Sequence, residues 1–183
     1  IAELLQDPRG EKITTALLAK KLDVSEAALY RHFASKAQMY EGLIEFIETG
    51  LFSVINKINA DEQSGVKQAE LIVSLLLGFA QKNRGLTRVL IGDALVNEDD
   101  RLQVRINQLL DRVEASLKQA LRIAASNNEL PQGEDAAAAA NLCLCYAIGR
   151  WQFFVKSGFT REPMAQWPQQ WPMLLAGCLS QPA

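Results

Sequence analysis

Apolar residues recur three or four positions apart along almost the whole chain, and this helical period constrains the fold more than any other feature of the sequence. The spacing is clear at Leu102, Ile106, Leu109, Val113 and Leu117. The sequence has no run of alternating β-branched residues and no Asn-Gly or Asp-Gly hairpin turn. We therefore predict an all-α fold of eight or nine helices with almost no strand.

Capping residues and breaks indicate the bounds of these helices. A first helix ends near Gln6, a second begins at Thr14 or Thr15, and Ser25 and Ser35 cap a short third and a long fourth helix. The next helix, at about 65–83, is apolar all round in its middle, so we expect it to be central and buried. Later helices are expected at about 86–95, around 102–117, at 135–157 and at 167–179, the last with its prolines in the first turn or at a kink.

Composition argues against several classes of function. The net charge is −2, so any contact with nucleic acid must come from a local arrangement of side chains. His32 is the only histidine, and Cys143, Cys145 and Cys178 have neither metal-ligand nor redox spacing. The longest apolar run has about half the length of a membrane span. We predict that the chain is not an enzyme, uses no metal or cofactor and does not span a membrane.

The segment ITTALLAKKLDVSEAALYRHFASK fits a helix-turn-helix, with two short helices joined by a tight turn. Its predicted inner core consists of Leu18, Leu22, Val24, Leu29 and Phe33. The hydroxyl, charged and small side chains that remain are expected to face outward, toward phosphate oxygens and base edges of DNA: Thr14, Thr15, Ser25, Glu26, Ala27, Ala28, Tyr30, Arg31, His32 and Lys36.

This segment resembles the DNA-binding motif of the TetR family of bacterial regulators in its capped helix, Val-Ser turn, Leu-Tyr and His-Phe pairs and following lysine. The resemblance implies a three-helix DNA-binding head on a larger helical body that dimerises through its last two helices. It also implies that Tyr30 and Lys36 contact backbone phosphates, Lys36 together with the N–H groups at its helix start. Asp23 stands where the family usually has glycine, and aspartate tolerates the left-handed conformation expected at that turn.

Base recognition is expected to depend on few side chains. Ala27 and Ala28 can touch a thymine methyl, and Glu26 can accept a hydrogen bond from cytosine N4. Residues 1–40 carry six Lys and Arg against five Asp and Glu, a weak positive charge for a DNA-binding head. Specificity should therefore also depend on Thr14, on Thr15 and on DNA shape, and the site should be a pseudo-palindrome.

Four segments of the chain resemble the nucleoid occlusion factors of the same family. They are SEAALYRHF, LIEFIE, LIVSLLLGFAQKNRGLTRVL and DRLQVRINQLLDRVEASLKQ. That resemblance implies a cytoplasmic, nucleoid-associated protein that antagonises polymers of the cell-division GTPase FtsZ when it is bound to DNA. It further implies a groove that accepts the C-terminal tail of FtsZ, between the long helix after Ser35 and helix 65–83, formed by Phe46, Leu75, Gly78, Lys82 and Asn83. The family has arginine where this chain has Lys82.

Two features of the body leave alternatives open. Gly78 lies within a helix, where glycine costs about 1 kcal/mol relative to alanine, so either a packed helix or a bound peptide should approach it closely. The aromatic residues near the C-terminus indicate either a dimer interface, which we favour, or a small-ligand pocket: Trp151, Phe153, Phe154, Trp167 and Trp171. The pocket corresponds to the alternative function, a TetR-family transcriptional repressor controlled by a small-molecule inducer.

The predicted organisation is a DNA-binding head at residues 1–40 and a body for dimerisation and partner binding at residues 41–183. The chain opens IAELLQDPRG, without methionine and already inside an apolar pattern, so we expect further residues of the head to precede Ile1.

Overall fold

The computed structural model describes residues 1–7, 13–130 and 135–178, with side chains up to Gly177. In these ranges the chain forms eight α-helices and two short 3-10 helices and no strand, which confirms the all-α prediction. The 3-10 helices are η1 (Leu4–Gln6) and η2 (Asp93–Leu95). The α-helices are α1 (Thr15–Lys21), α2 (Glu26–His32), α3 (Lys36–Asp61), α4 (Gly65–Lys82), α5 (Arg84–Leu90), α6 (Asp100–Ser126), α7 (Ala136–Lys156) and α8 (Trp167–Cys178).

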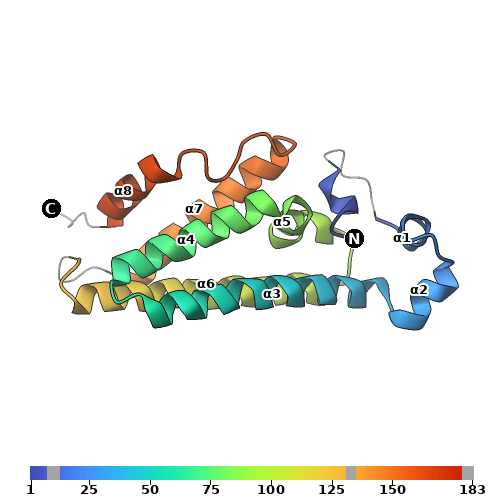
Figure 1. Ribbon diagram of the computed structural model, residues 1–183, viewed down its shortest axis with the longest axis horizontal. Helices are drawn as coiled ribbons and strands as arrows, with labels where there is room; N and C mark the ends of the chain where they lie inside the picture. Colours follow the sequence, from blue (N-terminus) through green and yellow to red (C-terminus); the bar gives the residue numbers. More distant parts are fainter. Residues whose placement is uncertain (8–12, 131–134, 179–183) are drawn as a thin grey trace.

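The long helices α3 and α6 run side by side along the long axis of the molecule (Figure 1). Helices α4 and α7 cross above them and pack against α6 and against each other. Helices α1 and α2 project at one end, beyond the start of α3, and α8 lies toward the opposite end (Figure 1). The candidate DNA-binding helices therefore form the tip of an elongated helical body.

Helix α4 lies at the centre of the core, as predicted. The indole N–H of Trp151 in α7 donates a hydrogen bond to the carbonyl oxygen of Leu76 in α4 (3.0 Å), which ties the two helices together inside the core. One flank of α4 is not covered, because Ser74, Leu75 and Gly78 are only partly buried. The fully buried residues of α4 include Ile72, Val73, Leu76 and Leu77.

Four of the five C-terminal aromatic residues pack inside the chain, so the favoured assignment of these four to a dimer interface was wrong. Trp151, Phe154, Trp167 and Trp171 are all buried, and only Phe153 is exposed. Neighbouring positions on a helix point about 100° apart, so Phe153 and Phe154 cannot both face the core. Helix α8 covers α7 with its two tryptophans, whose ring centroids lie 5.3 Å apart.

Two left-handed residues shape the connections between helices. The helix expected at 86–95 is divided, because Gly92 has a positive φ (78°) between the end of α5 and the start of η2. Glycine adopts this conformation without a steric penalty. The left-handed residue expected in the helix-turn-helix is confirmed, since Asp23 has φ 55°.

Candidate DNA-binding surface and partner groove

Two capped helices build the candidate DNA-binding surface. The hydroxyl oxygen of Thr14 accepts a hydrogen bond from the N–H of Leu17 (3.1 Å) at the start of α1. The hydroxyl oxygen of Ser25 accepts one from the N–H of Ala28 (3.1 Å) at the start of α2. These caps confirm both predicted helix starts and explain why two such short helices form at these positions.

Most of the predicted DNA contacts lie on the surface of this unit. The Thr15 hydroxyl donates a hydrogen bond to the Glu26 carboxylate (2.7 Å), which joins the N-terminal ends of α1 and α2. Tyr30 is 46% exposed. Thr15 and Ala28 are partly exposed, and the exposed members of the set are Thr14, Ser25, Glu26, Ala27, Tyr30, Arg31 and His32.

The predicted inner core of the helix-turn-helix is only partly correct. Leu18 and Leu29 are buried, whereas Leu22, Val24 and Phe33 are 60%, 43% and 38% exposed. Helices of seven residues have about two turns, so the contact between α1 and α2 covers their middles and leaves the side chains at their ends uncovered. An open apolar hollow of about 220 Å³ remains between the head and the first turns of α3, lined by Ile1, Leu18, Leu22, Leu29, Phe33, Met39 and Leu43.

Lys36 differs from the other predicted DNA contacts. Its ammonium group forms an ion pair with Glu98, in the segment between η2 and α6, and the Lys36 side chain is only 19% exposed. It also lies 5.7 Å from the centroid of the Tyr40 ring. Burial, with the Glu98 charge, raises the pKa of Tyr40 to about 12. Lys36, the residue expected to contact a DNA phosphate, is therefore held against the body in the DNA-free chain.

Helix α5 holds the N-terminal segment near the same place, the junction where the head meets the body. The Arg88 guanidinium is 8% exposed and pairs with Asp93 (2.5 Å), and a second nitrogen donates to the carbonyl oxygen of Leu5 (3.5 Å). A Cβ added to Gly85 would lie 2.0 Å from the carbonyl oxygen of Ala2, so a side chain here would break the contact between α5 and the segment before η1. Contacts at this junction thus connect the head to α5, the helix that follows α4 directly.

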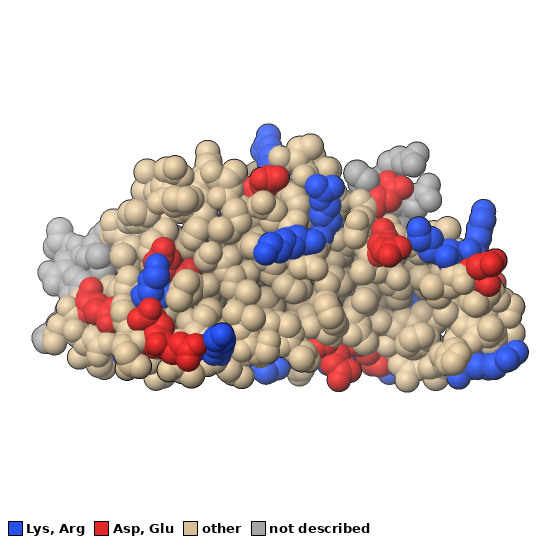
Figure 2. Space-filling view, viewed as in Figure 1, with Lys and Arg blue, Asp and Glu red and all other residues tan. Residues whose placement is uncertain are grey.

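An apolar groove of about 590 Å³ lies between α3 and α4. Among the described residues, Lys82 is the only charged one that lines it. Figure 2 shows few charged side chains over the middle of this face, and basic side chains near the junction of α4 and α5. The lining residues are Val54, Ile58, Leu71, Ser74, Leu75, Gly78, Phe79, Gln81, Lys82, Asn83 and Met164.

Four of the five predicted groove residues line this space, and Phe46 does not. Phe46 is 62% exposed and lies one helical turn before Gly50, on the same side of α3. Gly50 in turn faces Phe79, since its Cβ position lies 3.9 Å from that ring. Phe46 therefore continues the α3 side of the groove beyond Val54 instead of forming its floor.

Gly78 opens into the groove. A Cβ added to this residue would meet no atom within 4 Å, so tight packing against another helix of the described chain does not explain the glycine. The side-chain amide of the neighbouring Asn83 donates to the carbonyl oxygen of Phe79 (2.8 Å), which satisfies an acceptor at the end of α4. Lys82, next to Asn83, is exposed.

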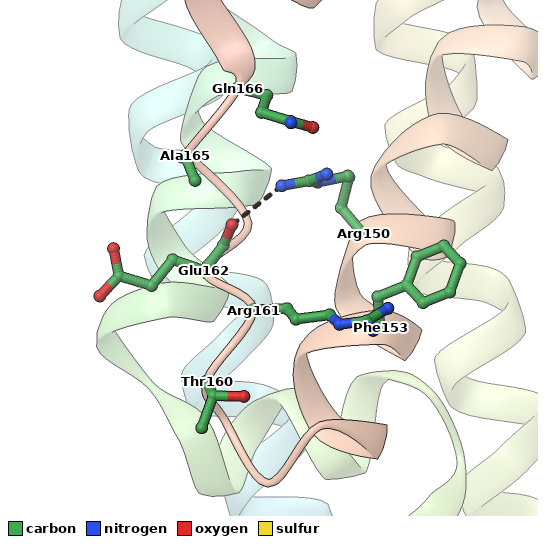
Figure 3. Close-up of a pocket in the computed structure, with 7 residues that line it drawn as sticks. All are labelled: Arg150, Phe153, Thr160, Arg161, Glu162, Ala165 and Gln166. Atoms are coloured by element: carbon green, nitrogen blue, oxygen red, sulfur yellow. Dashed lines mark hydrogen bonds between the residues drawn. The ribbon is translucent and has the colours of Figure 1, made fainter.

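A second hollow, of about 460 Å³, lies between the end of α7 and the segment that leads to α8 (Figure 3). Arg150 donates hydrogen bonds to the backbone carbonyls of Pro163 (3.2 Å) and Glu162 (2.9 Å). The Arg161 guanidinium lies 5.8 Å from the centroid of the exposed Phe153 ring. The arginines here mainly hold this segment against α7.

Among the described residues, no group of three or more His, Cys, Asp or Glu side chains is placed to hold a metal ion. The two cysteines with described surroundings lie on opposite sides of α7, since Cys143 is buried and Cys145 is exposed. None of the helices in the described ranges combines the length and the hydropathy that crossing a bilayer requires.

Comparison with known families defines the class of this protein. Residues 10–43 match the family model for bacterial regulatory proteins of the tetR family. Residues 63–178 match the SlmA-like model of the tetracyclin repressor-like C-terminal domain. Among solved structures, the TetR-family regulator PfmR from Thermus thermophilus superposes with a TM-score of 0.79 at 20% identity, covering 98% of this chain and 96% of PfmR. The fold is thus that of a TetR-type helix-turn-helix regulator.

Curated relatives narrow the assignment. The nucleoid occlusion factor SlmA from Alteromonas mediterranea is 52% identical over 171 residues, which cover 93% of this chain and 88% of that protein. SlmA from a Marinomonas species is 48% identical over 174 residues, 95% of this chain and 88% of the relative. The chain belongs to the SlmA family of nucleoid occlusion factors within the TetR family.

Proposed function

We propose that this protein is a DNA-binding nucleoid occlusion factor of the cytoplasm, associated with the nucleoid, that antagonises FtsZ polymers when it is bound to DNA. The observation that carries the proposal is the identity of about 50% to SlmA proteins, which extends over head and body alike. Generic TetR regulators share the head and diverge in the body, so similarity limited to the head would not support this function. In this proposal, the head at residues 1–40 binds DNA, and the body at residues 41–183 dimerises and binds the partner.

The DNA-binding part of the proposal rests on the exposed face of α1 and α2. Ser25, Glu26, Ala27 and Ala28 begin α2, the helix that would enter the major groove, and would meet base edges there. Side chains at the ends of the two helices would contact phosphates and fix the orientation of the head on DNA. These are Thr14, Thr15, Tyr30, Arg31, His32 and Lys36.

The α3–α4 groove is the proposed site for the C-terminal tail of FtsZ. Its apolar walls suit the apolar face of an amphipathic peptide, and the open position at Gly78 lets a peptide backbone come close to α4. Lys82 would pair with an acidic group of the tail. Its ammonium group would act as a point charge, because a lysine cannot form the two parallel hydrogen bonds that an arginine makes to a carboxylate. Phe46, at the end of the groove, and Asn83 complete the proposed contacts.

We further propose that two copies associate through α7 and α8. Leu142 and Phe153 of α7 and Met173 of α8 are exposed apolar residues on these helices (44%, 57% and 70%). A Cβ at Gly149, between Leu142 and Phe153, would meet no atom of the described chain within 4 Å, so a second copy could approach the α7 backbone there. Such a dimer would present two copies of α2 to a pseudo-palindromic DNA site.

The alternative of an inducer-controlled repressor has less support. A B. subtilis TetR-fold regulator solved with stearoyl-CoA superposes with a TM-score of 0.72, but at 16% identity this likeness concerns the fold alone. In this chain the tryptophans Trp151, Trp167 and Trp171 are buried in the body, so they leave little of their surface open to a ligand.

A sedimentation assay of FtsZ polymers, with and without a specific DNA site, tests the proposal. We expect the protein to reduce the amount of pelleted polymer and the DNA to strengthen this effect. Leu75→Glu and the exposed-site variant Lys82→Asp should bind an FtsZ tail peptide at least tenfold more weakly and keep DNA affinity within about threefold, because both residues lie on α4 and neither belongs to the exposed face of α1 and α2. If both folded variants bound the peptide like the unmodified protein, the groove would not be the partner site and the repressor alternative would be favoured.

A further inference from the structure

One wall of the α3–α4 groove does not come from α3 or α4. Met164, in the segment between α7 and α8, lines the groove together with residues of those helices, and its side chain is partly exposed. It lies 86 positions after Gly78 in the chain (164 − 78 = 86), so no local pattern predicts the contact. The segment that carries it therefore contributes to whatever the groove binds.

Hydrogen bonds from α4 hold Met164 in place. The side-chain oxygen of Gln81 accepts a hydrogen bond from the backbone N–H of Met164 (3.1 Å). The side-chain nitrogen of Gln81 donates to the Glu162 carboxylate (3.4 Å). Gln81 directly precedes Lys82, so this attachment places Met164 at the basic end of the groove.

Helix α7 holds the same segment from its other side. Arg150 donates to the backbone carbonyls of Glu162 and Pro163, and the bond to Glu162 is drawn in Figure 3. Pro163 is buried and its ring fixes its own φ, so the backbone directly before Met164 is restricted. The segment before Met164 is thus fixed at both sides while the Met164 side chain stays partly exposed.

We propose that Met164 is a specificity-determining residue of the partner groove and that Gln81 is the residue that positions it. The inference rests on the proposed peptide-binding function and adds a chemical requirement to it. The peptide should carry an apolar side chain next to the acidic group that meets Lys82, so that one contacts Met164 while the other contacts the ammonium group. A thioether side chain is flexible and polarisable, and it can adapt to the shape of that apolar side chain.

The test compares Met164→Gln with Met164→Leu in the full chain, using a fluorescent FtsZ tail peptide and anisotropy. Glutamine has nearly the length of methionine and replaces the apolar contact with a polar amide, and we expect about fivefold weaker peptide binding or more. Leucine should keep the affinity within about twofold, because it preserves an apolar surface of similar volume. Gln81→Ala should weaken binding, and its effect should not add to that of Met164→Gln, since both act through one contact.

Two comparisons separate this inference from the groove assignment. If Met164→Gln binds the peptide like the unmodified protein while Leu75→Glu has lost binding, the groove is the site and the role of Met164 is refuted. If neither variant changes binding, the groove assignment itself fails. DNA affinity serves as the folding control, and a loss of DNA binding shared by the glutamine and leucine variants would show that Met164 serves the fold and would also refute the inference.

Discussion

Glu129 joins the end of α6 to the start of α4. Its carboxylate accepts hydrogen bonds from the Ser64 hydroxyl (2.6 Å) and from the N–H groups of Gly65 (3.1 Å) and Val66 (3.0 Å). Burial raises the pKa of Glu129, but these bonds and one from Asn127 together lower it from its ordinary value of 4.5 to about 2. A carboxyl group with a lowered pKa in the folded state stabilises the fold above its unfolded pKa. This stabilisation is therefore lost as the pH falls from about 4.5 to about 2.

Glu129→Gln should lower the free energy of unfolding at neutral pH by about 1–2 kcal/mol, because charge-assisted bonds to a helix start are lost at a partly exposed site. Since the variant has no carboxyl group to protonate here, it should also lose less stability than the unmodified protein on acidification. Urea unfolding at neutral pH and at about pH 3 measures both effects. Asp111→Asn, at an exposed position of α6, is the matched control. Equal acid sensitivity of Glu129→Gln and the unmodified protein would contradict the assigned role.

Lys36 has two anionic partners in the proposed mechanism, Glu98 in the DNA-free chain and a phosphate in the DNA complex. Because one ammonium group cannot bind both fully, we expect Glu98→Gln to tighten DNA binding about threefold or more with little change in salt dependence. Lys36→Ala should reduce the slope of log K against log salt by about one unit. DNA titrations at several salt concentrations measure both the affinity of Glu98→Gln and the salt slope of Lys36→Ala.

The double variant Lys36→Ala/Glu98→Gln separates competition from general repulsion. If Glu98 acts through Lys36, the gain from Glu98→Gln should disappear in the double variant. If the double variant still bound DNA more tightly than Lys36→Ala, Glu98 would only repel the phosphate backbone. If Glu98→Gln alone bound DNA more weakly, the ion pair between Lys36 and Glu98 would orient the head.

At the scale of secondary-structure elements, α4 has to form a stable central helix and also leave one flank open. Gly78→Ala should raise the free energy of unfolding by up to about 1 kcal/mol, since alanine favours the helix and its Cβ would meet no atom within 4 Å. The same methyl group would fill part of the groove and weaken binding of the tail peptide. Gly42→Ala in α3, also at an open position, is the control that should stabilise without affecting the peptide. If Gly78→Ala bound the peptide normally, close approach of a peptide backbone would not account for this glycine.

At the scale of the whole molecule, the proposed dimer places two heads on one DNA duplex, with their α2 helices roughly 34–36 Å apart. Phe153→Glu should shift the protein to a monomer, because it places a charge in the apolar surface of α7. DNA affinity for a two-half-site duplex should fall strongly, while affinity for a single half-site should change little. Sedimentation equilibrium and DNA titration test this, with Val104→Glu, on the exposed side of α6, as the control. A dimeric Phe153→Glu would place the interface elsewhere.

The sequence by itself determined the helices and most of their starts. Ser25 and Ser35 were predicted as caps, and the helix start at Thr14 or Thr15 is capped by Thr14. Each of the three hydroxyl oxygens accepts a hydrogen bond from an N–H three residues ahead. Such bonds need only residues that are neighbours in the chain, so local chemistry specifies them. The left-handed turn at Asp23 was predictable for the same reason. The outward residues of α1 and α2 followed from the helix-turn-helix pattern, and the groove residues followed from resemblance to a known family.

Only the tertiary structure decided which side chains remain available for binding. Lys36 pairs with Glu98, 62 positions away, and Gln81 bonds to Met164, 83 positions away. The C-terminal tryptophans are buried because α8 folds back on α7, and Leu22 and Phe33 stay exposed because the contact between α1 and α2 is short. The periodicity of a helix tells which of its residues share a face, but not which helix covers that face. Which helix covers a given face depends on packing between segments far apart in the chain. The contribution of Met164 to the groove wall and the ion pair between Lys36 and Glu98 could therefore be recognised only in the folded molecule.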